Sequence, residues 1–419
     1  MELDRTPDTD RLREDIEANA AFGDVDAADG RGRTVLTGTD ADRKARERFV
    51  DRLADAGLDV TVDAVGNVAG TWAPPSADPD AAPVAAGSHL DSVPEGGIFD
   101  GPLGVYAALE AVRTLQEAGV EPTRPVVVVS FTEEEGQRYP GLLGSSVAAG
   151  ERSVEAALEI EDDDGVTLAQ ALESIGFRGE GRLDASEWDA WYELHVEQDS
   201  RLETAGVPVG VVTTITGITH CEVTIEGEAN HAGATPMGER TDALAAAAEF
   251  VLDVEAAAED VVGTTSESAV GTVGSLSVSP NATNVVPGRV EASVDVRDVA
   301  YESMETIVTA ARSSLSLLER ERGVDTAFAR PFDLRPTPMS ERLRTTAHDA
   351  GDAAGVETLD LHSGAAHDTM HVAGVTDAAL LFAPSRDGVS HNPREWTDWE
   401  DCATATRVLA GALAAAATE

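Results

Sequence analysis

The segment from residue 84 to residue 131 constrains the fold more than any other part of this sequence. It begins with the apolar run VAAGS (84–88), continues with PLGVYAALEAVRTLQEAG (102–119) and ends with PVVVVSF (125–131). The middle stretch starts with proline and ends with glycine, as helices prefer. The β-branched runs on either side are typical of strands buried on both faces. This order predicts a parallel βαβ unit and therefore a three-layer α/β/α domain.

The pattern changes at about residue 212. Alternating residues in TTITGITHCEVTIEGEANHAG, VGTVGSLSV and GRVEASVDVRD predict half-exposed strands, and TDALAAAAEFVLDVEAAA and ESMETIVTAARSSLSLLERERG predict helices. The order β-α-β-β-α-β predicts a ferredoxin-like, two-layer unit. From residue 329 the α/β pattern returns. We therefore predict one domain made of residues 1–211 and 329–419, with residues 212–328 inserted into it as a second domain.

Charge narrows the possible partners. The chain holds 77 acidic and 30 basic residues, a formal net charge of −47. We therefore do not expect nucleic acid or anionic membranes as partners, because binding phosphate requires a cationic surface. The acidic residues are spread over the chain between ordinary apolar segments, which is typical of a cytoplasmic protein from a halophile. The two cysteines lack CxxC spacing and no apolar stretch is long enough to span a membrane, so we expect a soluble cytoplasmic protein.

Four polar clusters each follow a predicted strand. They are GSHLDSVPEGGIFDG (87–101), TEEEGQR (132–138), ELHVEQ (193–198) and SHNPRE (390–395). A lone histidine at a strand end is more often structural than functional, three glutamates in so acidic a chain are often only solvated, and the glycine-rich segment is also compatible with a plain turn. Ligands gather at the carboxyl ends of parallel strands, however. The shared location of all four clusters favours a single site.

The residue types in these clusters indicate metal chemistry. Histidine nitrogens and carboxylate oxygens without cysteine suit zinc, with manganese and cobalt as alternatives. A carboxylate can bridge two such ions, which together activate water for hydrolysis. Asp100 is placed to bridge because glycines flank it. Asp91, two residues after His89, can orient that imidazole, and of two adjacent glutamates one can bind metal while the other moves protons.

Seven motifs carry a family resemblance. They are GSHLDSVPEGGIFDGPLGV, FTEEEGQRY, ELHVEQ, GEANHAGATPM, NATNVVPGRVEASVDVRD, HSGAAHD and SHNPREW. In this order and spacing they resemble the M20 metallopeptidase superfamily, and within it the hydantoinase/carbamoylase amidohydrolases. The resemblance runs from about residue 15 to the C-terminus. It implies hydrolysis of a small ureido or amide substrate that bears a carboxylate, two divalent ions, with zinc the first choice, and a homodimer formed through the inserted lid domain.

The same resemblance implies roles for single residues. It gives Glu134 as the general base and Asp91 as the residue that orients one histidine. In the inserted domain, His231 would stabilise the oxyanion, reaching across the dimer, and Asn284 and Arg297 would bind the substrate carboxylate. The implied metal ligands are His89, Asp100 and His195 for one ion and Asp100, Glu135 and His391 for the other. The implied pocket residues are Gln198, Gly364 and His367.

Two departures leave the substrate open. Asp199 stands where the family pattern has glycine after Gln198, and Ala366 replaces the glycine of SGAGHD. Cleavage of N-carbamoyl-L-amino acids is the first reading. Allantoate amidohydrolase, β-ureidopropionase and an aminoacylase or dipeptidase are the alternatives within this chemistry. A non-catalytic metal-binding protein is a distant alternative, because neither Glu134 nor any ligand is missing. A serine hydrolase is disfavoured because the chain has no G-x-S-x-G motif.

Overall fold

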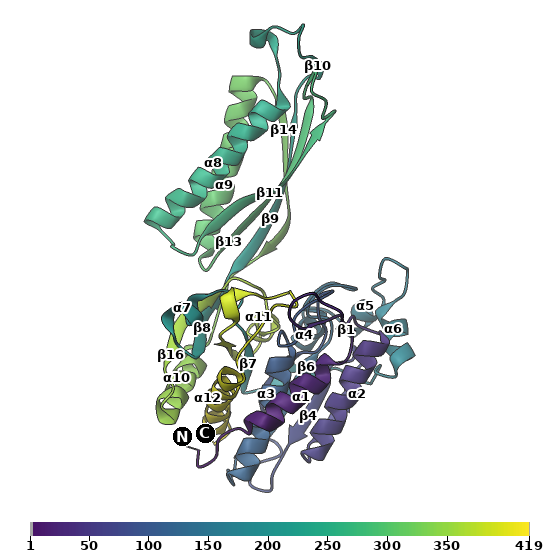
Figure 1. Cartoon of the computed structure of the whole chain (residues 1–419), viewed down its shortest axis with the longest axis vertical. Coiled ribbons are helices and arrows are strands. Elements are labelled where there is room, and N and C mark those ends of the chain that lie inside the picture. Colours follow the sequence, from purple (N-terminus) through teal and green to yellow (C-terminus); the bar gives the residue numbers. More distant parts are fainter. Residues whose placement is uncertain (1–2, 419) are drawn as a thin grey trace. The chain divides into compact units, whose positions relative to one another are not determined.

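The computed structural model describes residues 3–418 and divides into two compact units (Figure 1). Unit 1 comprises the chain up to Thr213 and from Met339 onward, and unit 2 is Thr214–Pro338. The second boundary lies beyond the predicted residue 328, because strand β14 (Asp325–Leu334) runs across that position while it pairs with β9 (Gly217–Glu226). Among residues 3–418, no helix is both long and apolar enough to cross a membrane.

A nine-stranded sheet, of which only β15 and the last two residues of β8 fall outside unit 1, has the order β15-β8-β17-β7-β5-β6-β4-β3, with β16 also paired to β8. Its four central strands are parallel to one another. They are β17 (Asp377–Ala383), β7 (Ala190–Val196), β5 (Val84–His89) and β6 (Val126–Phe131). The pairs β6–β4, β4–β3, β17–β8 and β8–β15 are antiparallel. The outer strands are β3 (Asp59–Val62), β4 (Val68–Trp72), β8 (Val209–Ile215), β15 (Thr337–Pro338) and β16 (Thr358–Ser363).

Helices cover both faces of this sheet, which confirms the predicted three-layer α/β class. Successive side chains of a strand point to opposite faces, so Val84 and Ala86 enter the larger core while Ala85 enters the smaller one. The larger core includes residues of α1 (Thr9–Ala20), α2 (Asp40–Asp55), α3 (Pro102–Glu117), α10 (Glu341–Ala354) and α12 (Trp399–Thr418). The smaller one includes Trp188, Trp191 and residues of α4 (Leu143–Ala148) and α11 (Thr369–Val372).

Shorter elements complete unit 1. They are β1 (Asp24–Val25), β2 (Gly32–Arg33), α5 (Val154–Leu158), α6 (Leu168–Ile175) and α7 (Arg201–Ala205). The pair β1–β2 is antiparallel and lies outside the main sheet. Arg33 in β2 also forms a bridge with Gly96, which brings this N-terminal segment onto the loop between β5 and α3.

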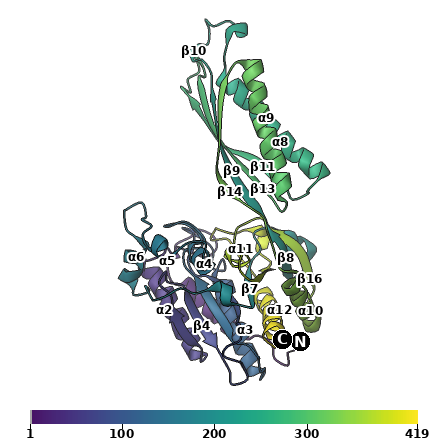
Figure 2. The same cartoon turned by 180° about the vertical axis from the view of Figure 1, so that it is seen from behind.

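Unit 2 is a four-stranded antiparallel sheet with two helices on one face. Its strand order is β11-β13-β9-β14, with β11 (Val270–Ser279) and β13 (Arg289–Asp298). Figures 1 and 2 show α8 (Ala243–Thr264) and α9 (Tyr301–Arg322) packed side by side, and their apolar faces share a core with the sheet. Two short strands, β10 (Asn230–His231) and β12 (Val285–Val286), pair with each other. The long elements follow the order β-α-β-β-α-β.

Candidate metal centre

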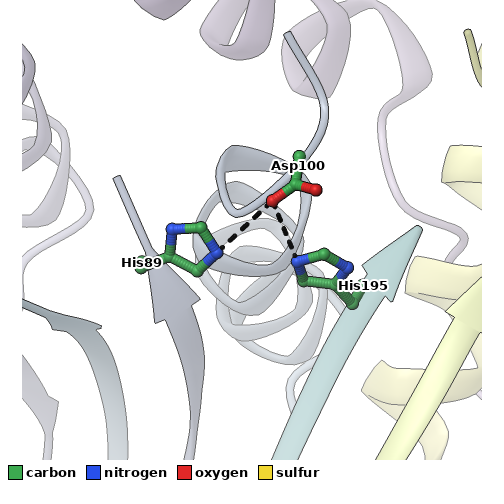
Figure 3. A group of neighbouring side chains, drawn as sticks. All are labelled: His89, Asp100 and His195. Carbon is green, nitrogen blue, oxygen red and sulfur yellow. Dashed lines mark ion pairs between the residues drawn. The ribbon is translucent and has the colours of Figure 1, made fainter. Parts of the chain in front are cut away.

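The four parallel strands of unit 1 bring polar side chains to one edge of the sheet. His89 ends β5 and His195 lies near the end of β7, while β6 runs into Glu134 and Glu135. The segment after β17 carries His391. Carboxyl ends of parallel strands meet at the same edge, and Figure 3 shows the histidines of β5 and β7 turned toward Asp100. The structure therefore brings together all four clusters that the sequence singled out.

The first group is His89, Asp100 and His195, all of them buried. Oδ1 of Asp100 lies 3.5 Å from Nε2 of His89 and 3.4 Å from Nε2 of His195 (Figure 3). Among the partners that residues 3–418 offer, Nε2 of His89 has no hydrogen bond. A buried polar atom without a partner is costly. Because that nitrogen faces a carboxylate oxygen and a second imidazole, the group fits a divalent cation.

The second group shares Asp100. Nε2 of His391 lies 3.6 Å from Oδ2 of Asp100 and 3.4 Å from Oε2 of Glu135. The two oxygens of Asp100 thus face different groups, which is how a carboxylate bridges two metals. A third set of potential ligand atoms, from His89, Glu134 and Glu135, lies between these groups. Glu134 adjoins the first group, with its Oε2 3.7 Å from Nε2 of His89.

Protonation at this edge shows what a cation would replace. Burial opposes ionisation of Asp100, but the charge and hydrogen bond of His195 and the charge of His89 hold its pKa well below its ordinary value. Burial likewise disfavours charge on His195, yet Asp100 raises the pKa of His195 to about 9. Burial and the nearby Asp100 raise the pKa of Glu135 to about 8, and burial raises that of Glu134 well above its ordinary value. Without metal, therefore, the cluster retains protons that a bound cation would displace.

Asp91 ties two of the clusters together. Its Oδ1 lies 3.6 Å from Nδ1 of His89, and its two oxygens accept the backbone N–H groups of Glu134 (3.3 Å) and Glu135 (3.0 Å). The backbone carbonyl of Asp91 is also within 3.2 Å of Nδ1 of His89. Asp91 can therefore orient the imidazole through its carbonyl, with its carboxylate beside the same nitrogen, while the carboxylate fixes the turn that follows β6.

The three adjacent glutamates have separate surroundings. Glu133 has a left-handed backbone (φ 55°), and its Oε1 accepts the N–H groups of Arg138 (2.7 Å) and Tyr139 (2.9 Å). Glu133 therefore shapes the turn, whereas Glu134 and Glu135 face the histidines. Residue type alone could not separate these roles, because all three are acidic and consecutive, and only the family resemblance assigned roles to Glu134 and Glu135.

Glycines around Asp100 make room for other parts of the site. Gly101 has φ +80°, and a Cβ there would lie 2.6 Å from the ring of His89. At Gly97 a Cβ would lie 2.2 Å from Oε1 of Glu395. These contacts show that side chains of the site occupy the space beside the glycines that flank Asp100.

Three more residues contact the groups around Asp100. The amide of Gln198 donates to Oδ2 of Asp100 (3.2 Å), as does the hydroxyl of Ser390 (2.7 Å). Ser390 was not predicted as a site residue, although it lies in the motif SHNPRE. The ring of His367 is buried, with its centroid 4.6 Å from that of His195. Gly364 is exposed on the loop after β16, and Ala366 is half-buried.

The three site residues predicted in unit 2 do not all lie together in the structure. His231 is exposed in β10, and the N–H of Ala232 bonds the carbonyl of Asn284 (2.9 Å), so His231 and Asn284 are close neighbours. Asn284 precedes the Arg289 end of β13, whereas Arg297 lies near the other end. From Arg289 to Arg297 an antiparallel strand rises about 27 Å. Within one chain, Asn284 and Arg297 therefore do not meet at one small carboxylate, contrary to the simplest reading of the sequence.

Arg297 is held by its own strand. Its guanidinium donates to Oδ1 (3.0 Å) and Oδ2 (3.1 Å) of Asp295. Asp295 also lies 3.0 Å from Nε2 of His220, whose ring stacks on that of Phe332. These side chains lie on the sheet face that carries the exposed positions of β9 and β13.

Comparison with known proteins identifies relatives along most of the chain. The model of peptidase family M20/M25/M40 matches residues 85–415. An N-carbamoyl-L-amino acid amidohydrolase of Geobacillus stearothermophilus is 41% identical over 393 residues, 93% of this chain and 94% of that protein. An allantoate amidohydrolase of Bacillus subtilis is 34% identical over 334 residues, 79% of this chain and 80% of that protein. The crystal structure of a hydantoinase/carbamoylase family amidase from Burkholderia multivorans superimposes with a TM-score of 0.92 at 35% identity, covering 99% of both chains.

Proposed function

This chain belongs to peptidase family M20/M25/M40, and we propose that it is a two-metal amidohydrolase that cleaves the carbamoyl C–N bond of N-carbamoyl-L-amino acids. Cleavage of one C–N bond by water gives an amine and a carbamic acid, and the carbamic acid then decomposes, so the final products are the amino acid, carbon dioxide and ammonia. The observation that carries this proposal is the position of Asp100, whose two oxygens face two separate groups of ligand atoms. The choice of substrate follows the relative from Geobacillus stearothermophilus, which shares more identity with this chain than the allantoate amidohydrolase does.

On this proposal, the ligands are the residues of the two groups. His89, Asp100 and His195 would hold one ion, and Asp100, Glu135 and His391 would hold the other. Two divalent ions, zinc first and manganese or cobalt as alternatives, would polarise the carbamoyl carbonyl and lower the pKa of a water molecule so that it loses a proton more readily.

Glu134 moves the proton. It adjoins the first ligand group, and burial raises its pKa, which suits a group that must accept a proton from water and then release it. Glu134 takes this proton as water attacks the carbamoyl carbon, and it gives the proton to the leaving nitrogen as the C–N bond breaks. Asp91 keeps His89 oriented throughout by facing its Nδ1.

The residues of unit 2 are proposed to act from two chains. His231 stabilises the oxyanion, and Asn284 and Arg297 bind the substrate carboxylate. Because Asn284 precedes the Arg289 end of β13 and Arg297 lies near the other end of that strand, they contact one substrate only if different chains supply them. We therefore propose a homodimer in which His231 and Asn284 complete the site of the partner.

The surface of unit 2 supports this dimer. Strand β11 is at the edge of its sheet, where unpaired backbone groups can extend the sheet into a second copy. Leu276 on that strand is 40% exposed and Leu252 on α8 is 61% exposed. An open sheet edge can pair with the same edge of a second copy, and the two leucines would lose exposed apolar surface if they lay in that contact.

The test measures ammonia release in molar potassium chloride with zinc, manganese or cobalt. The substrates are N-carbamoyl-L-amino acids, N-carbamoyl-β-alanine, allantoate and N-acetyl amino acids. We expect metal-dependent turnover of N-carbamoyl-L-amino acids, and a loss of about 10³-fold or more in Glu134→Gln. Glu133→Gln is the matched control, because glutamine retains the oxygen that accepts the two turn amides, and it should stay active.

Each other outcome changes the proposal in a defined way. Preferred turnover of allantoate or N-carbamoyl-β-alanine would keep the mechanism and replace the substrate. Turnover of acetyl substrates alone would move the chain to the aminoacylase side. No turnover of any substrate, with metal bound, would contradict the proposal and favour a non-catalytic metal-binding protein.

A further inference from the structure

Residues 90–101, which we term the ligand loop, join β5 to α3 and connect His89 with Asp100. We propose that Arg33 and Glu395 form a clamp on the ligand loop, and that this clamp sets the metal affinity of the site by fixing Asp100 relative to His89. The inference rests on the proposed function, because it takes His89 and Asp100 to be metal ligands. Neither Arg33 nor Glu395 has a part in the mechanism above.

Arg33 holds both ends of the ligand loop. Its side chain is completely buried. Nη1 donates to the carbonyl of Leu90 (3.0 Å), and Nη2 donates to the carbonyls of Asp91 (3.0 Å) and Asp100 (3.4 Å). One planar guanidinium thus joins the residues that follow His89 to the backbone of Asp100. A lysine keeps the charge but cannot present two amino groups fixed in one plane.

The backbone around Arg33 fixes the position of this guanidinium. The N–H of Arg33 donates to the carbonyl of Gly96 (3.0 Å), and the N–H of Ser92 donates to the carbonyl of Val35 (2.9 Å). The hydroxyl of Ser92 also accepts the N–H of Val35 (2.9 Å). The segment of residues 33–35 therefore lies along the ligand loop as a paired strand would. The guanidinium is a built part of the loop and not a side chain that happens to be near it.

Glu395 grips the same loop by its amides. Its side chain is buried, and Oε1 accepts the N–H groups of Phe99 and Asp100, both at 3.0 Å. Its other oxygen lies 3.0 Å from the hydroxyl of Ser390, which is itself 2.7 Å from Oδ2 of Asp100. Gly97 leaves the space that this carboxylate fills. Glu395 therefore holds the backbone of Asp100 directly, and the hydroxyl of Ser390 lies between the two carboxylates, where its one proton can be donated to either of them.

Arg33 and Glu395 hold opposite sides of the backbone of Asp100. Arg33 donates to its carbonyl and Glu395 accepts from its N–H, so the peptide units on both sides of Asp100 are fixed. The proposed metals require both oxygens of this carboxylate in defined positions. Outer partners that orient a ligand in this way typically change metal affinity about 10–100-fold when they are removed. Arg33 and Glu395 are thus positioning residues, which act through Asp100.

The experiment measures the zinc dissociation constant of the full chain after removal of metal with EDTA, by competition with a chromogenic chelator. We expect Arg33→Lys and Glu395→Ala each to raise this constant about 10–100-fold. Glu395→Gln retains an oxygen for the two amides, so it should stay within a few-fold of the wild type. This rescue separates loss of the grip from loss of the charge.

Arg113→Lys is the matched control. Arg113 is also buried, but it donates to Asp15 (2.8 Å) and to the carbonyl of Arg52, away from the ligand loop. It should lower the unfolding temperature of the metal-free protein without changing the zinc dissociation constant. A merely structural role for Arg33 would give the same result as this control.

Gly97→Ala keeps the proposal testable if Arg33→Lys does not fold, because the added Cβ displaces Glu395 without removing either grip residue. It should also weaken zinc binding. Wild-type zinc affinity in the folded variants among Arg33→Lys, Glu395→Ala and Gly97→Ala would overturn the clamp. A wild-type chain that binds no zinc, manganese or cobalt would instead contradict the proposed function.

Discussion

The carboxyl edge of the parallel strands in unit 1 and the sheet of unit 2 hold their candidate residues in opposite ways. In unit 1, His89, Asp100 and His195 are buried and their ligand atoms lie within 4.8 Å of one another. In unit 2, His231 is exposed on the separate β10–β12 pair, and Arg297 lies on β13 of the four-stranded sheet, near the end away from Arg289. Four strands that run in one direction concentrate side chains at one edge, whereas antiparallel strands spread them over a face and two ends.

This difference teaches what each unit can do alone. The edge in unit 1 has a complete set of potential metal ligands and a candidate base, so it can assemble metal chemistry within one chain. The candidate residues of unit 2 do not all lie close together in their own chain, because Arg297 is far from His231 and Asn284. They become a binding site only when another surface, from a second copy on our proposal, brings a substrate to them.

Mixing the subunits of two inactive variants has the largest expected effect, and it tests whether the residues of unit 2 serve the site of the partner. Glu134→Gln removes the proposed base in unit 1. His231→Ala deletes an oxyanion donor in unit 2 and should lower the activity about 10²–10³-fold. If His231 serves the partner, mixing the two variants restores about a quarter of wild-type ammonia release, since half of the dimers are mixed and each retains one intact site.

Metal content is the control for this experiment, since both variants should retain the metal of the wild type. A mixture that stays as inactive as its components, after subunit exchange has been shown by mass spectrometry, would mean that His231 acts within its own chain. The comparison of the two units would then need another explanation for the exposed histidine.

The sequence predicted the edge of unit 1 better than the face of unit 2, for a physical reason. The end of a buried parallel strand is visible in the sequence, and His89, Glu134 and His195 each lie at such an end. Asn284 and Arg297 are only thirteen positions apart, but an extended chain converts that spacing into a long distance.

Contacts from remote segments were the other part that the sequence could not predict. Arg33 reaches the ligand loop from a short N-terminal strand, and GRGRT has no feature that assigns it a partner. Glu395 was visible within SHNPRE, but in a chain with 77 acidic residues one more glutamate carries little information. Only the folded structure shows that the carboxylate of Glu395 occupies the space that a side chain at position 97 would fill.

Arg297→Lys tests the unit 2 side with a smaller effect. Lysine loses the planar, two-pronged contact with a carboxylate, so the KM for N-carbamoyl-L-amino acids should rise about tenfold or more, with less change in kcat. The corresponding N-carbamoyl amino acid amide, which has no carboxylate, should show no such difference. Steady-state kinetics on both substrates measures the effect.

Arg289→Lys is the matched control, because Arg289 lies at the opposite end of the same strand and pairs with Glu226 and Glu291 on the surface. Its kinetics should match the wild type. Equal losses in the two variants, or equal losses of Arg297→Lys on acid and amide substrates, would show that Arg297 supports the sheet and does not bind the carboxylate.

The smallest expected effect is the pH dependence of stability, which should belong to unit 1. In the metal-free fold the pKa of His195 is raised to about 9 and that of Glu135 to about 8. Both folded pKa values exceed the ordinary ones, so the folded chain retains protons that the unfolded chain releases. The stability that these protons contribute is lost as the pH rises through about 8 to 9.

With EDTA, the unfolding temperature should therefore fall by a few degrees between pH 6.5 and pH 9. Metal displaces the protons and binds more tightly at high pH, so added zinc should flatten or reverse this slope. The His231→Ala variant should keep the wild-type slope and His195→Asn should reduce it, whereas a metal-free protein that is more stable at pH 9 than at pH 6.5 would contradict the protonation of the cluster.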